Sequence, residues 1–147
     1  MNSKLKLSFS CYLIASLLLV AYGLFYLLRP EFMPYHAEAV GKSWVEVDPA
    51  FQILILALMK AVGGGFLASA FAMVVLLFKA FRKGLRWSFW AIPAIGLIVS
   101  FTSLYVTATV ALNTPASPPW MVAAFGIVLL TVGFIFSALS DESTEKS

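Results

Sequence analysis

Residues 48–81 read DPAFQILILALMKAVGGGFLASAFAMVVLLFKAF and are apolar almost throughout. Asp48 followed by Pro49 is a strong helix start, because an aspartate side chain accepts hydrogen bonds from free amide groups and proline fits the first helical position. A cluster of basic residues begins at Lys79. The stretch therefore predicts a long membrane-spanning helix over residues 51–78.

This helix is longer than a bilayer is thick. At about 1.5 Å per residue, residues 48–81 extend about 50 Å, against a hydrocarbon core of about 30 Å. The helix must therefore project, tilt strongly or break, and the three glycines at 63–65 are where a break is expected. If the helix continues, Lys60 lies at the outer membrane boundary and its ammonium group reaches water. If it breaks, Lys60 is buried.

The composition places the whole chain in a membrane. Of 147 residues, 61% are hydrophobic and only 12% are charged, whereas a water-soluble domain needs more charge on its surface. We expect an all-α, membrane-embedded four-helix bundle in one domain. Its predicted spans are 7–28, 51–78, 87–112 and 119–139. The predicted connections are an extracytoplasmic loop at 29–50, a basic loop at 79–86 and a polar tail at 140–147.

The charges of the loops predict the orientation. Residues 79–86 contain four Lys/Arg and no acid, while residues 29–48 contain two Lys/Arg and four Asp/Glu. Cytoplasmic loops carry the excess of Lys/Arg, so we expect both termini and the basic loop in the cytoplasm. The net charge of +3 is then a topology signal, and we expect no nucleic-acid partner.

Two stretches carry a family resemblance: MPYHAEAVGKSW at 33–44 and LALMKAVGGG at 56–65. They resemble uncharacterised small four-span inner-membrane proteins of bacteria, some of them grouped with DoxX-like sequences. The resemblance covers roughly residues 30–70. It implies a bacterial inner (plasma) membrane and a compact four-helix fold, and it carries over no function and no catalytic or binding residue.

In the predicted topology, most polar side chains of the spans fall in the outer half, and the cytoplasmic half is nearly bare. We expect an outward-open polar pocket, covered by the loop at 29–50, in which Lys60 faces a lipid head group or a small anionic ligand, or pairs with Glu46 or Asp48. The alternative is that the hydroxyls bond their own helix backbone four residues back. The candidate ligand-binding residues are Lys60, Gln52, Tyr22, Tyr26, Ser103, Tyr105 and Thr107.

Small residues on two spans predict close helix packing, because membrane helices approach one another through such residues. The packing takes place either within one bundle or between protomers, as in a homo-oligomer or a larger membrane complex. The residues are Ala57, Ala61, Gly64, Gly65, Ala68 and Ala72 on the span at 51–78, and Gly133 and Ser137 on the span at 119–139.

Sequence patterns typical of enzymes are missing. The chain has no glycine-rich phosphate loop, no HExxH and no GxSxG, and its predicted spans contain no Asp or Glu. One cysteine, Cys11, and one histidine, His36, are too few for a disulfide or a usual zinc site. We expect no catalytic residue, metal or cofactor. The favoured function is a non-enzymatic, partner- or lipid-binding membrane subunit; the alternatives are a small solute or ion carrier or channel component, and a membrane enzyme using Lys60 or His36.

Overall fold

The computed structural model describes residues 2–145, with side chains up to Ser140. This part of the chain is helical and contains no strand. Four helices are long and apolar enough to cross a membrane, which confirms the all-helical, four-span prediction. They are α1 (Ser3–Leu28), α3 (Pro49–Lys79), α4 (Ser88–Asn113) and α5 (Trp120–Glu145). The shorter elements are α2 (Pro34–Val40) and the 3₁₀ turns η1 (Trp44–Glu46) and η2 (Phe81–Lys83).

Helix α5 continues into the segment predicted as a polar tail at 140–147. Helix α5 extends to Glu145, so this segment begins as helix. The side chains of residues 141–145, and residues 146–147 altogether, lie outside what the structure describes. The polar character of this tail is therefore described from the sequence only.

Helix α3 begins where the sequence predicts. The Asp48 carboxylate accepts the amide N–H of Ala50 at 2.8 Å, and Pro49 occupies the first helical position. The helix then runs for 31 residues without a break at the glycine triplet, a length of about 46 Å. Gly84, whose φ of 72° lies in the left-handed region, ends η2 before the chain turns into α4.

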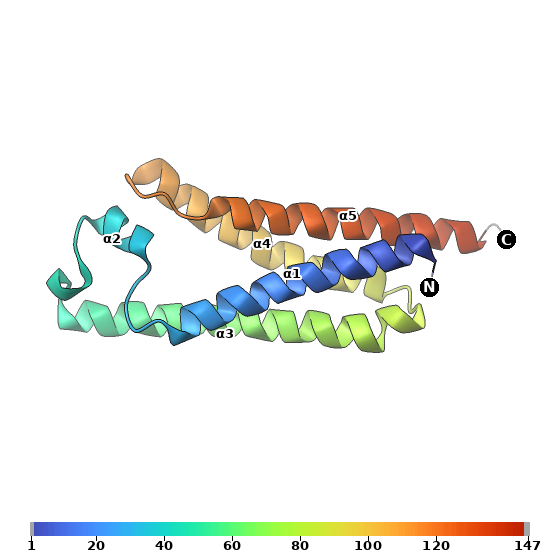
Figure 1. Ribbon diagram of the computed structural model, residues 1–147, viewed down its shortest axis with the longest axis horizontal. Coiled ribbons are helices and arrows are strands. Elements are labelled where there is room, and N and C mark those ends of the chain that lie inside the picture. Colours follow the sequence, from blue (N-terminus) through green and yellow to red (C-terminus); the bar gives the residue numbers. More distant parts are fainter. Residues whose placement is uncertain (1, 146–147) are drawn as a thin grey trace.

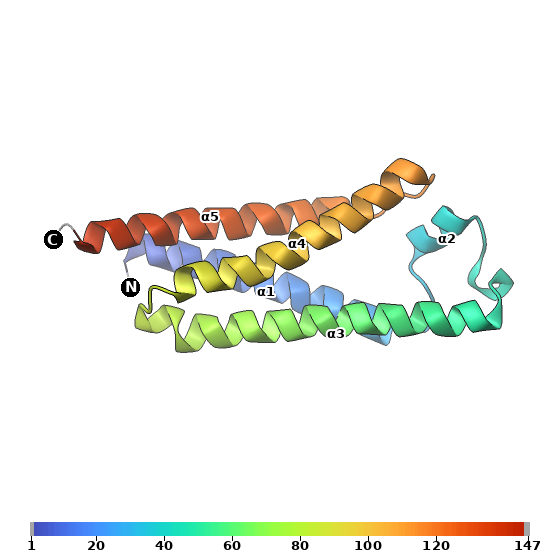
Figure 2. The ribbon, with the colours of Figure 1, turned by 180° about the vertical axis from the view of Figure 1, so that it is seen from behind.

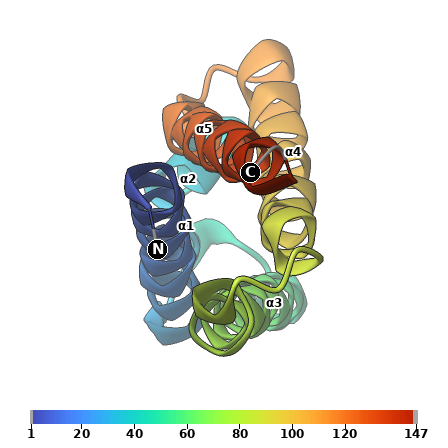
Figure 3. The same ribbon diagram turned by 90° about the vertical axis from the view of Figure 1, so that its right-hand side faces the viewer.

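The four long helices form two pairs, α1 with α3 and α4 with α5. The pairs meet at one end of the molecule and spread apart toward the other (Figures 1 and 2). We call the end where the pairs meet the basic end, because it carries Lys4, Lys6 and residues 79–86. We call the opposite end the α2 end; it carries α2 and the connection from α4 to α5. Viewed along the bundle, α1 lies between α3 and α5 (Figure 3).

The core of the basic end is built around Tyr12, which is fully buried. Its hydroxyl donates to the carbonyl of Phe89 at 3.2 Å, and its ring meets Phe81 edge-on with centroids 5.6 Å apart. The Ser8 hydroxyl donates to the Gly133 carbonyl at 2.6 Å. The expectation that this half is nearly bare of polar side chains is therefore wrong. Ser8, Tyr12 and Ser16 follow each other at intervals of four, which places them on one helix face.

Helix α1 meets α3 at two glycines, Gly23 and Gly63. A Cβ atom added to Gly63 would lie 2.8 Å from the Gly23 carbonyl oxygen, closer than two such atoms approach, so both backbones come into contact here. On α5, Gly133 makes room in the same way for the Tyr12 ring, and Ser137 is buried. Small residues thus bring helices together inside the chain, as membrane helices generally do.

The six small residues of α3 that were predicted to pack, here called the small-residue stripe, lie largely on the exposed side of the helix. Ala57, Ala61, Gly64, Gly65 and Ala68 are exposed, and Ala72 is half-buried. A Cβ atom added at either exposed glycine would meet nothing within 4 Å. The buried face of α3 is formed by other residues, so the stripe lies largely outside the packing within this chain. Of the two alternatives drawn from the sequence, packing between protomers or against a partner remains a prediction.

Candidate functional site

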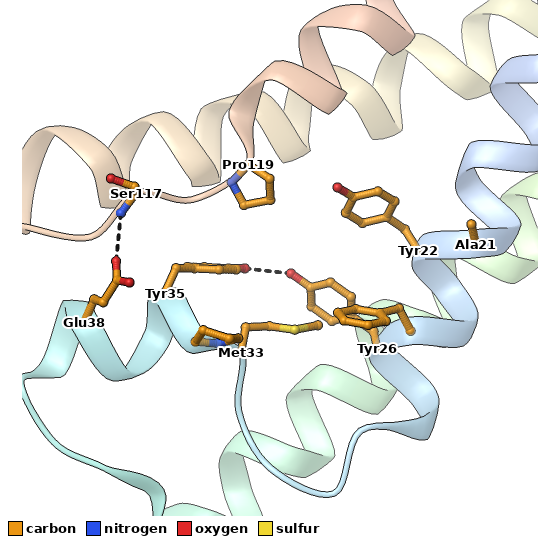
Figure 4. A pocket seen from close by; sticks show the side chains of 10 residues that line it. Ala21, Tyr22, Tyr26, Met33, Tyr35, Glu38, Ser117 and Pro119 are labelled. Atoms are coloured by element: carbon orange, nitrogen blue, oxygen red, sulfur yellow. Dashed lines mark hydrogen bonds between the residues drawn. The ribbon is translucent and has the colours of Figure 1, made fainter.

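A pocket of about 490 Å³ opens at the α2 end. Three separate segments form its walls: the last two turns of α1, helix α2 with the residues before it, and the connection from α4 to α5 (Figure 4). Most of the lining is apolar or aromatic. The lining residues are Ala21, Tyr22, Phe25, Tyr26, Met33, Pro34, Tyr35, Glu38, Ser117 and Pro119. This set is called the tyrosine pocket below.

Local sequence places the tyrosines. Tyr22 and Tyr26 are four residues apart near the end of α1, so their side chains share one face of the helix. Pro34 is the first residue of α2 and fixes the point at which this short helix begins. Tyr35, the next residue, is thereby turned toward Tyr26, and the two hydroxyls lie 2.7 Å apart (Figure 4).

A second hydrophobic cluster holds α2 in place. Phe32, Met33 and Met59 are buried together, and the Phe32 and Trp44 rings meet nearly edge-on with centroids 4.9 Å apart. Met59 belongs to α3, so the loop packs on a spanning helix. Helix α2, whose Tyr35 and Ala37 pack against this cluster, forms one wall of the tyrosine pocket.

Two hydrogen bonds join the walls of the pocket. One links Tyr26 and Tyr35, and burial raises the pKa of the Tyr35 phenol, so this group stays protonated. The other runs from the backbone N–H of Ser117 to a Glu38 carboxylate oxygen at 3.2 Å. The Tyr22 hydroxyl points across the pocket toward Pro119 and forms no hydrogen bond within the described residues (Figure 4).

His36 supports the same wall from behind and does not line the pocket. Its Nδ1 accepts the backbone N–H of Met33 at 3.4 Å, and its ring lies edge-on to Tyr35 with centroids 4.3 Å apart. Burial lowers the pKa of His36 below the ordinary value of 6.5, because the charged form is poorly solvated there. No group of three metal-ligating side chains occurs in the part of the chain that is described.

The lowered pKa of His36 predicts that α2 is held less stably at acidic pH. Above pH 6.5 the histidine is neutral in both the folded and the unfolded state. Below it, the unfolded state takes up the proton first, so the free energy of unfolding falls as the pH falls. We expect thermal unfolding in detergent to show this loss between about pH 7 and pH 5. The variant His36→Asn, whose side-chain oxygen can replace Nδ1 as acceptor, should show a smaller slope; an equal slope contradicts the assignment.

The structure brings Tyr22 and Tyr26 to the pocket but not Lys60 or Gln52. Lys60 is exposed, because Met59 and Gly63 take the buried face of α3 and Lys60 lies about 100° round the helix from its neighbour. The Gln52 amide donates to the carbonyl of Trp44 at 2.7 Å and holds η1 against α3. Gln52 therefore has a local structural partner.

The three candidates on α4 also lie outside the pocket. Ser103 and Thr107 donate to the carbonyls four residues back, Val99 and Ser103, at 2.8 Å each. This is the alternative that the sequence left open for the hydroxyls. Tyr105 is 73% exposed on the outside of the bundle. Helix α4 thus contributes no side chain to the described lining.

Eight lining residues, all except Tyr22 and Tyr26, were not predicted from the sequence; Met33, Tyr35, Glu38 and Ser117 are among them. Tyr35 and Met33 sit in a proline-rich loop that carries no periodic pattern, and Ser117 follows a turn some eighty positions later. A usable signal was present nonetheless. Pro34 marks the start of a helix and so fixes the position of Tyr35. Tyr22 and Tyr26 share one face near the end of the preceding span, so a cluster of the three tyrosines could have been predicted.

The lining of the tyrosine pocket is mostly apolar and aromatic, with few polar groups. The lining comprises three phenols, one carboxylate, one serine and apolar groups, and the described lining holds no histidine, cysteine or lysine. The comparisons assign no activity either: no protein-family model matches the chain, and no curated protein or solved structure does. The resemblance to small four-span inner-membrane proteins therefore stays a prediction.

Proposed function

We propose that this chain is a non-enzymatic, multi-pass membrane protein that binds a lipid or a small amphiphilic molecule in the tyrosine pocket. The observation that carries this proposal is the cavity itself, about 490 Å³ walled by three chain segments. Ligand sites are typically concave, mostly apolar, and equipped with a few fixed polar groups. The Tyr22 and Glu38 side chains supply such groups here.

For the orientation, we propose that the basic end faces the cytoplasm of a bacterial cell, with both termini there and the pocket outside the inner membrane. Lys4, Lys6 and four basic residues of 79–86 gather at the basic end, while the acids of the loop lie at the α2 end. The excess of Lys/Arg on short cytoplasmic segments supports this direction.

The carrier or channel alternative has less support. A permeation path would have to continue from the pocket to the basic end, where Tyr12, Leu77, Ile92 and Leu130 are buried in one packed cluster. We therefore keep binding as the function. The exposed small-residue stripe of α3 supports an added proposal, contact with another membrane helix in a homo-oligomer or a larger complex.

The proposal is tested by filling the pocket. Ala21 lines it, so Ala21→Trp places an indole in the cavity without removing either hydrogen bond that joins the walls. We expect protein purified in mild detergent to retain a small molecule or lipid, detected by native mass spectrometry, and the variant to lose most of it.

Lys60→Leu is the matched control, because Lys60 was the centre of the predicted pocket and does not line the observed one. We expect this variant to retain the bound molecule as the parent does. Loss from Lys60→Leu together with retention by Ala21→Trp would show that the ligand binds elsewhere. A parent protein that retains nothing contradicts the binding function.

A further inference from the structure

The tyrosine pocket has the opposite charge to the one expected from the sequence. Glu38 is the one charged side chain among its described lining residues, whereas the exposed Lys60 is absent from them. Arg29 borders a neighbouring groove, where its guanidinium lies 3.6 Å from the Glu31 carboxylate and over the Phe25 ring. The pocket therefore presents a negative group and no positive one.

The residues around the pocket keep this negative character. His36, behind the Tyr35 wall, is neutral at pH 7 because burial lowers its pKa. The whole loop at 29–48 carries four acids against two bases. Of the two Glu38 oxygens, one accepts the Ser117 N–H and the other accepts no hydrogen bond from the described residues. A carboxylate oxygen is thus available to a ligand.

The walls add a second feature that favours cations. Tyr22, Tyr26 and Tyr35 line the cavity with their rings (Figure 4). The face of an aromatic ring attracts a positive charge through its quadrupole, and aromatic cages recognise quaternary ammonium groups in this way. An anion would meet the Glu38 carboxylate, which repels it.

We propose that the ligand of the tyrosine pocket is a small organic cation, an amine or quaternary ammonium group attached to an apolar body. The positive group lies between Glu38 and the tyrosine rings, and the apolar body lies against Ala21 and Met33. The inference rests on the proposed binding function. The volume of about 490 Å³ is in the range of drug-sized ligands, which favours a small molecule over a two-chain phospholipid.

The test compares three benzyl probes that differ in charge, in maltoside detergent, which adds no charge. Benzyltrimethylammonium is the cation, neopentylbenzene its neutral carbon isostere, and phenylacetate the anion. We expect the cation to bind saturably by calorimetry and to raise the unfolding temperature, and the neutral and anionic probes to bind more weakly. Glu38→Gln keeps a hydrogen-bond acceptor for Ser117 and removes the charge; it should weaken binding of the cation about fivefold.

Two further variants make the test specific. Glu46→Gln removes an acid of the same loop that does not line the pocket, and it should bind the cation as the parent does. Tyr22→Leu removes a ring face whose hydroxyl has no hydrogen bond within the described chain, and it should weaken the cation selectively. Tyr22→Leu tests the cation inference independently if Glu38→Gln fails to fold.

The outcomes separate the two proposals. If none of the probes binds saturably, the binding function itself fails. If the neutral isostere or the anion binds as tightly as the cation, and Glu38→Gln changes neither, the pocket binds ligands but the cation inference is overturned. An aminophospholipid that copurifies and is not displaced by benzyltrimethylammonium would assign the pocket to a lipid head group and overturn the small-molecule source.

Discussion

Replacing Gly63 with alanine should destabilise the protein by about 1–3 kcal/mol, the usual cost of forcing an extra carbon into a packed interior. The added Cβ would lie 2.8 Å from the Gly23 carbonyl oxygen and 3.1 Å from the Leu27 backbone nitrogen. Backbone atoms cannot rotate away as a side chain can, so α1 and α3 must separate. The measurement is the free energy of unfolding in mixed detergent, followed by circular dichroism.

The glycine triplet supplies its own control. Gly64→Ala and Gly65→Ala meet no atom within 4 Å, and alanine is a better helix former than glycine. We expect both variants to unfold at the parental free energy or up to about 1 kcal/mol above it. Equal destabilisation by all three substitutions would contradict the α1–α3 contact, because only Gly63 faces Gly23.

Replacing Tyr12 with alanine should cost more, about 3 kcal/mol or above, in the range found for large-to-small changes at buried aromatic residues. Tyr12 is fully buried, contacts Phe81 edge-on, and its ring fills the space that Gly133 leaves. In lipid the transfer part of this cost shrinks, because lipid tails are apolar too. The cavity and the lost van der Waals contacts remain.

Two tyrosine variants serve as comparisons for this prediction. Tyr12→Phe keeps the ring and removes the hydroxyl that donates to the Phe89 carbonyl at 3.2 Å, so we expect a loss of about 1 kcal/mol. Tyr105→Ala changes a tyrosine that is 73% exposed on α4, and it should be close to neutral. A neutral Tyr12→Ala would mean that the core of the basic end is not packed as described. Unfolding in mixed detergent measures all three.

Features that depend on one segment at a time could be predicted from the amino-acid sequence. Length and apolarity are conditions that each span meets alone, so four spanning helices could be predicted. The start of α3 was also local, because Asp48 and Pro49 act on the amide groups directly after them. The gathering of Lys/Arg in residues 79–86 is likewise visible in the sequence, since these residues are neighbours in the chain.

The tertiary structure alone decided which side of each helix faces its neighbours. The glycines at 63–65 are identical in sequence, yet only Gly63 contacts α1, while Gly64 and Gly65 lie open. Lys60 was predicted to line the pocket because the sequence does not show which side of α3 faces the other helices. In water, the apolar face of a helix marks its buried side; in lipid, the surroundings are as apolar as the core, so hydropathy carries little information about rotation. The tyrosine pocket, assembled from three distant segments, follows from these rotations and from the docking of α2.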